Sequence, residues 1–206
     1  MPFSTTANDQ MLDALNGGSP SSIIAYASLH TAYSSSGSSE VTGGSPAYAR
    51  VAVTWSAASG SSKASASLAS SFNIPASTTV AFVGLWSAAS SGTFAGMGPA
   101  GAGTQYAWTC TNASPGVFTA PGSGYSNTQT VVLFNAAGAT IPAAFTVGTI
   151  YYVVSASGTT FSLSATSGGS AINTSGAGAG LVQAITTEAF AGQGTYSVTG
   201  ETLTIT

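Results

Sequence analysis

The pattern of apolar and polar positions changes once along the chain, from a helical period to a strand period. Four apolar residues fall on one helical stripe: Ala7, Met11, Leu12 and Leu15. Thr5 or Thr6 can cap this segment, and Asn16-Gly17-Gly18 supplies a left-handed stop. From Ser21 onward, apolar residues alternate with small polar ones, and clusters of Ser and Gly interrupt the alternation. The pattern predicts a short N-terminal helix followed by β-structure.

The alternating segments are predicted to be strands that pack into a sandwich. They cover residues 22–31, 48–55, 63–74 and 78–86, and a final strand contains Leu203 and Ile205. In the second of them the residues expected to point inward are Ala49, Val51, Val53 and Trp55. The last strand ends near the C-terminus, so we expect it to pair inside a sheet. Many short strands with frequent turns are typical of an all-β sandwich.

The segment 109–183 differs in residue composition from the rest of the chain. It contains the uncharged stretch "FTVGTIYYVVSASGTTFSLSATSGG", and both of its flanks are rich in Gly, Ala and Ser. Such flanks are usual where a module is inserted into a loop. We therefore predict a discontinuous sandwich domain, residues 1–108 plus 184–206, that carries a small inserted β module at 109–183.

Composition narrows the classes of protein that fit this pattern. Charged residues make up 3% of the chain, hydrophobic residues 44%, and the net charge is -3. Ordinary hydrophobicity with little charge argues against disorder. The apolar runs are far shorter than the ~20 residues that cross a bilayer, and the start lacks a signal peptide, so we expect a cytoplasmically made protein without membrane contact. Because Arg50 and Lys63 are the only basic residues, we expect no nucleic-acid partner.

The chain offers few residues for catalysis or metal binding. His30 is the only histidine, no Gly-x-Ser-x-Gly elbow is present, and a structural role for His30 is expected. The carboxylates show no pair suited to acid–base work: Asp9, Asp13, Glu40, Glu188 and Glu201. Cys110 and His30 are too few for a zinc centre, and Cys110 is expected to be buried and inert. We expect no cofactor, no metal and no enzymatic activity.

Two stretches resemble proteins of tailed bacteriophages. The first runs from Gln10 to Gly96 and contains "LDALNGG", "LHT", "EVTGGSPAYAR" and "GLW". It resembles virion surface proteins described as head-decoration, head-fibre or minor tail proteins. The second, from Ile141 to Gly180, is similar to a small β module of tail-fibre and other virion proteins. The resemblance implies an all-β, jelly-roll-like sandwich, with the N-terminal helix and the inserted module, on a virion surface.

Two functions fit the resemblance and the scarcity of charge. The first is a decoration or cement protein that binds the major capsid protein on the head and associates with itself, as a trimer or another homo-oligomer. The alternative is a minor tail or tail-fibre protein that binds a host-surface glycan. The second function would use exposed aromatic residues on which a sugar can stack: Tyr106, Trp108, Tyr125, Tyr151 and Tyr152. The other interpretation of these aromatics is that they form a core.

Overall fold

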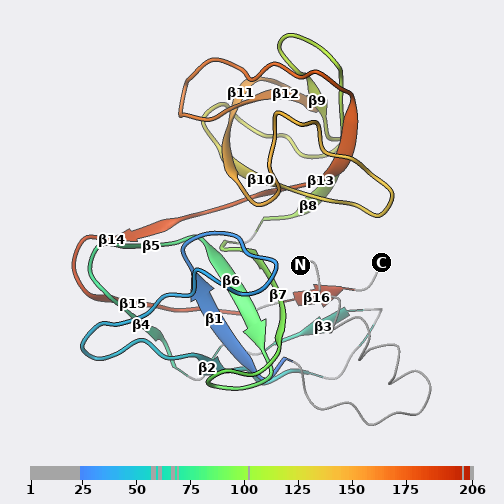
Figure 1. Ribbon diagram of the computed structural model, residues 1–206. Helices are drawn as coiled ribbons and strands as arrows, with labels where there is room; N and C mark the ends of the chain where they lie inside the picture. Colours follow the sequence, from blue (N-terminus) through green and yellow to red (C-terminus); the bar gives the residue numbers. More distant parts are fainter. Residues whose placement is uncertain are drawn as a thin grey trace. The chain divides into compact units, whose positions relative to one another are not determined.

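The computed structural model describes residues 24–200, except 57–58, 60–61, 66–67, 69 and 102, together with residues 202–204. The predicted N-terminal helix lies outside these residues, as does Ile205. All the regular elements in the described part of the chain are β-strands (Figure 1). The predicted all-β class is confirmed. No membrane-spanning helix is found in this described part.

The chain divides into two compact units. The first comprises Met1–Gly98 and Thr187–Thr206, and the second comprises Pro99–Thr186. The second unit spans more of the sequence than the inserted module expected at 109–183. The reason is that the strand Gln105–Cys110 pairs within the second unit along its whole length.

The first unit is built on a four-stranded sheet in the order β2-β1-β6-β7. These strands are β1 (Tyr26–His30), β2 (Val51–Ala52), β6 (Phe82–Trp86) and β7 (Phe94–Pro99). β1 pairs antiparallel with both β2 and β6. Every residue of β6 and β7 is buried, so both faces of the sheet are covered. The sheet therefore has no solvated face along these two strands.

Three two-stranded ribbons join the C-terminal segment of the first unit to its earlier strands. The pairs are β3 (Ser62–Ala64) with β16 (Thr202–Thr204), β4 (Phe72–Ile74) with β15 (Gly194–Tyr196), and β5 (Thr78–Val80) with β14 (Glu188–Phe190). The sheets together form a sandwich-like arrangement. Leu203 lies opposite Lys63, which confirms that the last strand pairs inside a sheet.

Three of the predicted strands are shorter or more divided than expected. The segment 63–74 forms two strands, β3 and β4, which pair with different partners. The segment 78–86 is divided at Ala81, because β5 pairs with β14 whereas β6 pairs with β1. Of the segment 48–55 only Val51–Ala52 is a strand, and Ala49, predicted to point inward, is exposed. The pairing partner changes within 63–74 and within 78–86, and alternation within a sequence does not encode that change.

The second unit is a closed antiparallel barrel in the order β10-β11-β12-β9-β8-β13 (Figure 1). Its strands are β8 (Gln105–Cys110), β9 (Phe118–Thr119), β10 (Thr130–Phe134), β11 (Ile150–Ser157), β12 (Thr160–Ser164) and β13 (Gly178–Ala184). Closure pairs each strand on both sides, so the barrel has no free sheet edge. Between Pro99 and Thr186 the sequence contains no Asp, Glu, Lys, Arg or His.

Aromatic side chains fill the interior of the barrel. The centroid of the Phe118 ring lies 4.9 Å from that of Trp108, 5.1 Å from Phe145 and 5.5 Å from Phe161. Gly180, opposite Trp108 on β13, leaves room for the indole, because an added Cβ would lie 2.9 Å from Trp108 Cζ2. The core is thus assembled from residues of the second unit alone.

The chain enters and leaves the second unit side by side. The backbone N–H of Thr186 donates to the carbonyl of Ala100 at 2.9 Å. Close by, the Gln183 side-chain amide donates to the carbonyl of Gly103 at 2.8 Å. Adjacent ends are what a module inserted into a loop requires.

Candidate functional site

The five aromatic residues proposed for ligand contact do not form one exposed group. Trp108, Tyr125 and Tyr151 are 1%, 7% and 5% exposed, and all three belong to the barrel core. They therefore take the core role that the sequence left open. Tyr106 is half-buried and packs edge-on against Tyr125, with ring centroids 6.0 Å apart. Tyr152 is half-buried on β11, where it lies opposite Thr130 and Ser164.

Cys110 lies in the same core, where its thiol is buried. Burial raises the pKa of the thiol to about 11. A raised pKa lowers the fraction of thiolate, the nucleophilic form of the group, at neutral pH. The predicted burial of Cys110 is confirmed, and its inertness stays a prediction.

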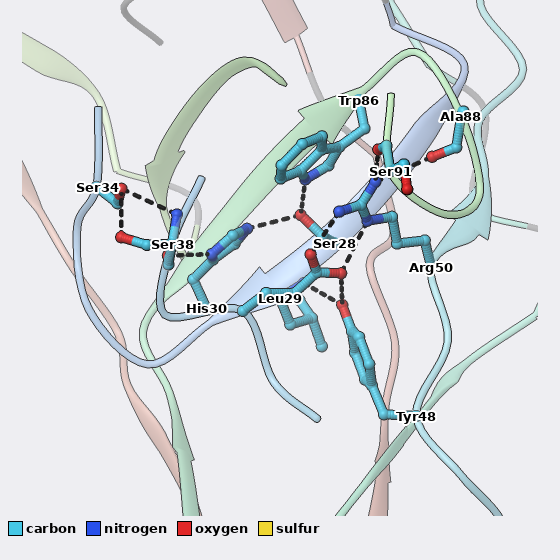
Figure 2. A network of polar contacts seen from close by, with 11 residues as sticks. Ser28, Leu29, His30, Ser34, Ser38, Tyr48, Arg50, Trp86, Ala88 and Ser91 are labelled. Atoms are coloured by element: carbon cyan, nitrogen blue, oxygen red, sulfur yellow. Dashed lines mark hydrogen bonds and ion pairs between the residues drawn. The ribbon is translucent and has the colours of Figure 1, made fainter. Parts of the chain in front are cut away.

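Three motifs of the first stretch, those that contain Leu29, Glu40 to Arg50 and Trp86, meet in the first unit near the guanidinium of Arg50 (Figure 2). The motif LDALNGG lies outside the described residues. Arg50 makes a bidentate ion pair with Glu40: Nε donates to Oε1 at 2.9 Å and Nη2 to Oε2 at 2.7 Å. Nη1 donates to the carbonyls of Ala88 and Ser91 at 3.1 and 2.7 Å. The guanidinium carbon lies 3.6 Å from the centroid of the Trp86 ring. One side chain thus joins three separate segments.

The ion pair is shielded from solvent and fully partnered. The Arg50 and Glu40 side chains are 9% and 18% exposed. Tyr48 extends the network, because its hydroxyl donates to Glu40 Oε1 at 3.3 Å and accepts the backbone N–H of Leu29 at 2.8 Å. Burial raises the pKa of Tyr48, so its hydroxyl stays protonated. A bidentate arginine with satisfied neighbours favours a single geometry for the loops it joins.

His30 lies in a second chain of hydrogen bonds that is buried beside the first. Its Nδ1 is 3.0 Å from the carbonyl of Ser38, which can only accept, so Nδ1 carries the hydrogen. Nε2 is then the acceptor for the hydroxyl of Ser28 at 2.7 Å. The indole N–H of Trp86 in turn donates to Ser28 Oγ at 2.9 Å. This order fixes the neutral tautomer and confirms the structural role predicted for His30.

Ser28 Oγ and His30 Nε2 are as close, at 2.7 Å, as the serine and histidine of a hydrolase dyad, but neither side chain is accessible to a substrate. Both residues are 0% exposed. The serine oxygen accepts the Trp86 indole N–H, and a Cβ added at Gly84 would lie only 2.6 Å from it. A nucleophile must reach a substrate carbonyl, and this hydroxyl is enclosed by β6. Within the described residues, no group of three or more His, Cys, Asp or Glu could hold a metal ion.

The loop 34–39 covers this network. Ser34 Oγ accepts the backbone N–H groups of Ser36 and Ser38 at 3.1 and 3.0 Å. Gly37 lies against Trp86 and Phe94 with a φ of +81°. The loop is therefore held by its own hydroxyl and by close contact with two aromatic rings.

Replacing Gly37 with alanine should lower the free energy of unfolding of the first unit by about 3 kcal/mol. The added Cβ would lie 2.7 Å from Phe94 Cδ2, and it would add overpacking of about 1–3 kcal/mol to a backbone strain of about 1 kcal/mol. Gly43→Ala is the matched control, since Gly43 has a φ of +88° but nothing within 4 Å of an added Cβ. Urea denaturation should give a clearly larger loss for Gly37→Ala. Equal losses would mean that strain alone acts at Gly37.

Comparison with known proteins places these motifs in a family. Residues 2–107 match the family described as podophage GP4 fiber I protein gp80, and this range is more than half of the 206 residues. The chain belongs to this fibre protein family. The matched range contains His30, Glu40, Arg50 and Trp86, and it ends inside β8. No curated protein and no solved structure matches the chain.

Membership of the fibre protein family confirms the predicted resemblance to bacteriophage virion surface proteins. The chain is a virion-associated structural protein of a bacteriophage. Sequence reasoning found the motifs but missed Ser28, Ser34 and Ser38, whose hydrogen bonds complete the network. Nothing distinguishes these serines in the sequence, because the chain is rich in serine throughout.

Proposed function

We propose that this protein is a non-enzymatic fibre subunit of a podophage virion, in which the first unit assembles into the particle and the barrel is displayed. The observation that carries the proposal is the family match over residues 2–107, which contains the whole Arg50 network. An assembly unit must present its loops in one fixed geometry. The bidentate ion pair and the buried hydrogen-bond chain supply that rigidity.

Self-association and attachment to neighbouring virion proteins are part of this proposal. Val117 is the only large hydrophobic side chain that stands out as exposed among the described residues. Interfaces made by this surface would therefore use small and hydroxyl side chains and backbone groups. Weak contacts of this kind become stable when several copies bind together, and the proposed homo-oligomer, trimeric or otherwise, would provide this multivalency.

Immunogold labelling of intact particles with an antibody to residues 99–186 tests the location. Gold on the fibres or tail supports the proposal and favours a contribution to host attachment. Gold spread over the head would replace it with the capsid-decoration role that binds the major capsid protein. In that case particles that lack the protein should be less resistant to heat than complete particles.

The host-attachment part of the proposal is tested by glycan binding. Because Trp108, Tyr125 and Tyr151 are core residues, only Tyr106 and Tyr152 of the five aromatics retain partial exposure for stacking on a sugar. We expect Tyr152→Ser to reduce adsorption of particles to host cells, with Tyr152→Phe as the matched control that keeps the ring. Unchanged adsorption in both variants would remove Tyr152 from host attachment.

The non-enzymatic part has its own test. A fluorophosphonate probe, which labels activated serines, should leave the folded protein unlabelled because Ser28 is enclosed. Labelling that disappears in Ser28→Ala would overturn this part of the proposal and establish a serine hydrolase.

A further inference from the structure

The hydrogen-bond chain at His30 has only one possible order of protons in its neutral form. The donor at its start is the Trp86 indole N–H and the acceptor at its end is the Ser38 carbonyl. Neither group can reverse its role. Ser28 and His30 between them must therefore each accept from one side and donate to the other.

A proton added to His30 Nε2 breaks this order. The Nε2 atom becomes a donor, so Ser28 Oγ faces two donors, Trp86 Nε1 and His30 Nε2, and its own hydrogen loses its acceptor. Gly84 closes the β6 side of the space beside the ring to a water molecule. Gly84 packs so closely that an added Cβ would lie 2.5 Å from Nε2.

The surroundings also disfavour a cation at His30. The side chain is fully buried, and burial lowers its pKa from 6.5. The bond to the Ser38 carbonyl and the charge of Glu40 favour the protonated ring and Arg50 opposes it, but burial is the largest effect and the pKa is lowered overall. Both Glu40 oxygens are already bound by Arg50. Gly84 and Trp86 on β6, Phe94 on β7 and Ser38 in the loop bring no ionisable group.

A protonated ring regains hydration, and the conflict at Ser28 is relieved, when His30 leaves its enclosed position. Its Nδ1 bond to Ser38 is one of the contacts that fasten the loop 34–39 to the sheet. Further contacts are the bond from Thr31 N–H to the Ser39 carbonyl at 3.0 Å, the bond from Ser34 N–H to Met97 Sδ on β7 at 3.2 Å, and the packing of Gly37 on Trp86 and Phe94. The loop and the histidine therefore share one local opening.

We propose that His30 makes the loop 34–39 an acid-operated latch, closed when the imidazole is neutral and opened by its protonation. The direction of the effect follows from linkage. The open state binds a proton near pH 6.5, whereas the closed state resists it, so the closed state loses stability as the pH falls below 6.5. The proposal concerns a property of the fold and does not depend on where in the virion the protein is located.

Amide hydrogen exchange on the full-length chain measures the opening directly. After correction for intrinsic rates, exchange of residues 34–41 should accelerate about tenfold between about pH 7.5 and about pH 5.5, the change expected for uptake of one proton. Carboxyl groups mostly titrate below about pH 5, so this window isolates the histidine. Amides of the barrel, which has no Asp, Glu, Lys, Arg or His, are an internal control and should not change.

A variant of His30 and the nitrogen chemical shifts of its ring test whether this histidine controls the opening. His30→Asn can still donate to the Ser38 carbonyl but takes up no proton, so its loop exchange should not depend on pH, even if the variant is less stable. In the unaltered protein, nitrogen chemical shifts of His30 should report a neutral closed state at about pH 6. A pH-independent loop in the unaltered protein, or a folded state that protonates His30 with the loop still closed, would overturn the latch.

Discussion

Replacement of Arg50 by methionine is expected to lower the free energy of unfolding of the first unit by about 3 kcal/mol or more. The substitution leaves the Glu40 carboxylate, 18% exposed, without the two donors that now neutralise it. It also frees the carbonyls of Ala88 and Ser91 and removes the cation from the face of Trp86. Chemical denaturation followed by tryptophan fluorescence would measure the loss.

Two comparisons identify the cause of that loss. Lys63→Met removes the same charge from the chain and should cost less, so an equal loss would attribute the effect to net charge. The double variant Glu40→Gln with Arg50→Met removes the unpaired carboxylate and should recover part of the stability. No recovery would mean that the ion pair with Glu40 is not the important contact of Arg50.

Excision of the barrel should leave the first unit folded. When residues 99–186 are replaced by a short Gly-Ser linker between Gly98 and Thr187, we expect a change in stability below about 1 kcal/mol. The reason is that the ends of the barrel already meet, with Thr186 N–H bonded to the Ala100 carbonyl at 2.9 Å. Exchange of the amides in β1 and β6 would show whether their protection persists.

A second excision at the boundaries suggested by the sequence is the matched control. Removal of residues 109–183 leaves Gln105–Trp108, most of β8, without the strand β13 that pairs with it. That product should expose Trp108 and aggregate. The result would contradict the prediction if excision of residues 99–186 unfolds the first unit, or if both products are equally stable. Pro99 and Thr186 would then not mark the boundary of an independently stable unit.

The sequence predicted the class of the fold and the family better than it predicted the strands. The predicted strand 22–31 contains β1, which is shorter (Tyr26–His30), and alternation assigned one strand to 78–86, where β5 and β6 have different partners. Alternation reports that a segment is extended, whereas strand ends depend on which segment lies alongside. That partner is often far away in the chain, as with Glu188 opposite Val80.

The sequence was likewise insufficient to predict the residues of the candidate site. The five candidate aromatics could not be told apart in the sequence, and only closure of the barrel separates those inside from those that keep some exposure: Tyr106, Trp108, Tyr125, Tyr151 and Tyr152. His30 could be given a structural role because it is the only histidine. Its partners could not be named, because Ser28 and Ser38 are ordinary members of a serine-rich chain.

The position of Arg50 has a consequence for digestion of the protein. Trypsin cuts only after Lys and Arg, so the chain offers it two bonds, after Arg50 and after Lys63, and everything from Ala64 to Thr206 is a single uncleavable fragment. In the folded protein the Arg50 side chain is occupied by Glu40, Ala88 and Ser91 and cannot enter a protease pocket. Cleavage after Arg50 therefore requires the network to open. The rate of cleavage at this bond reports how often the network opens.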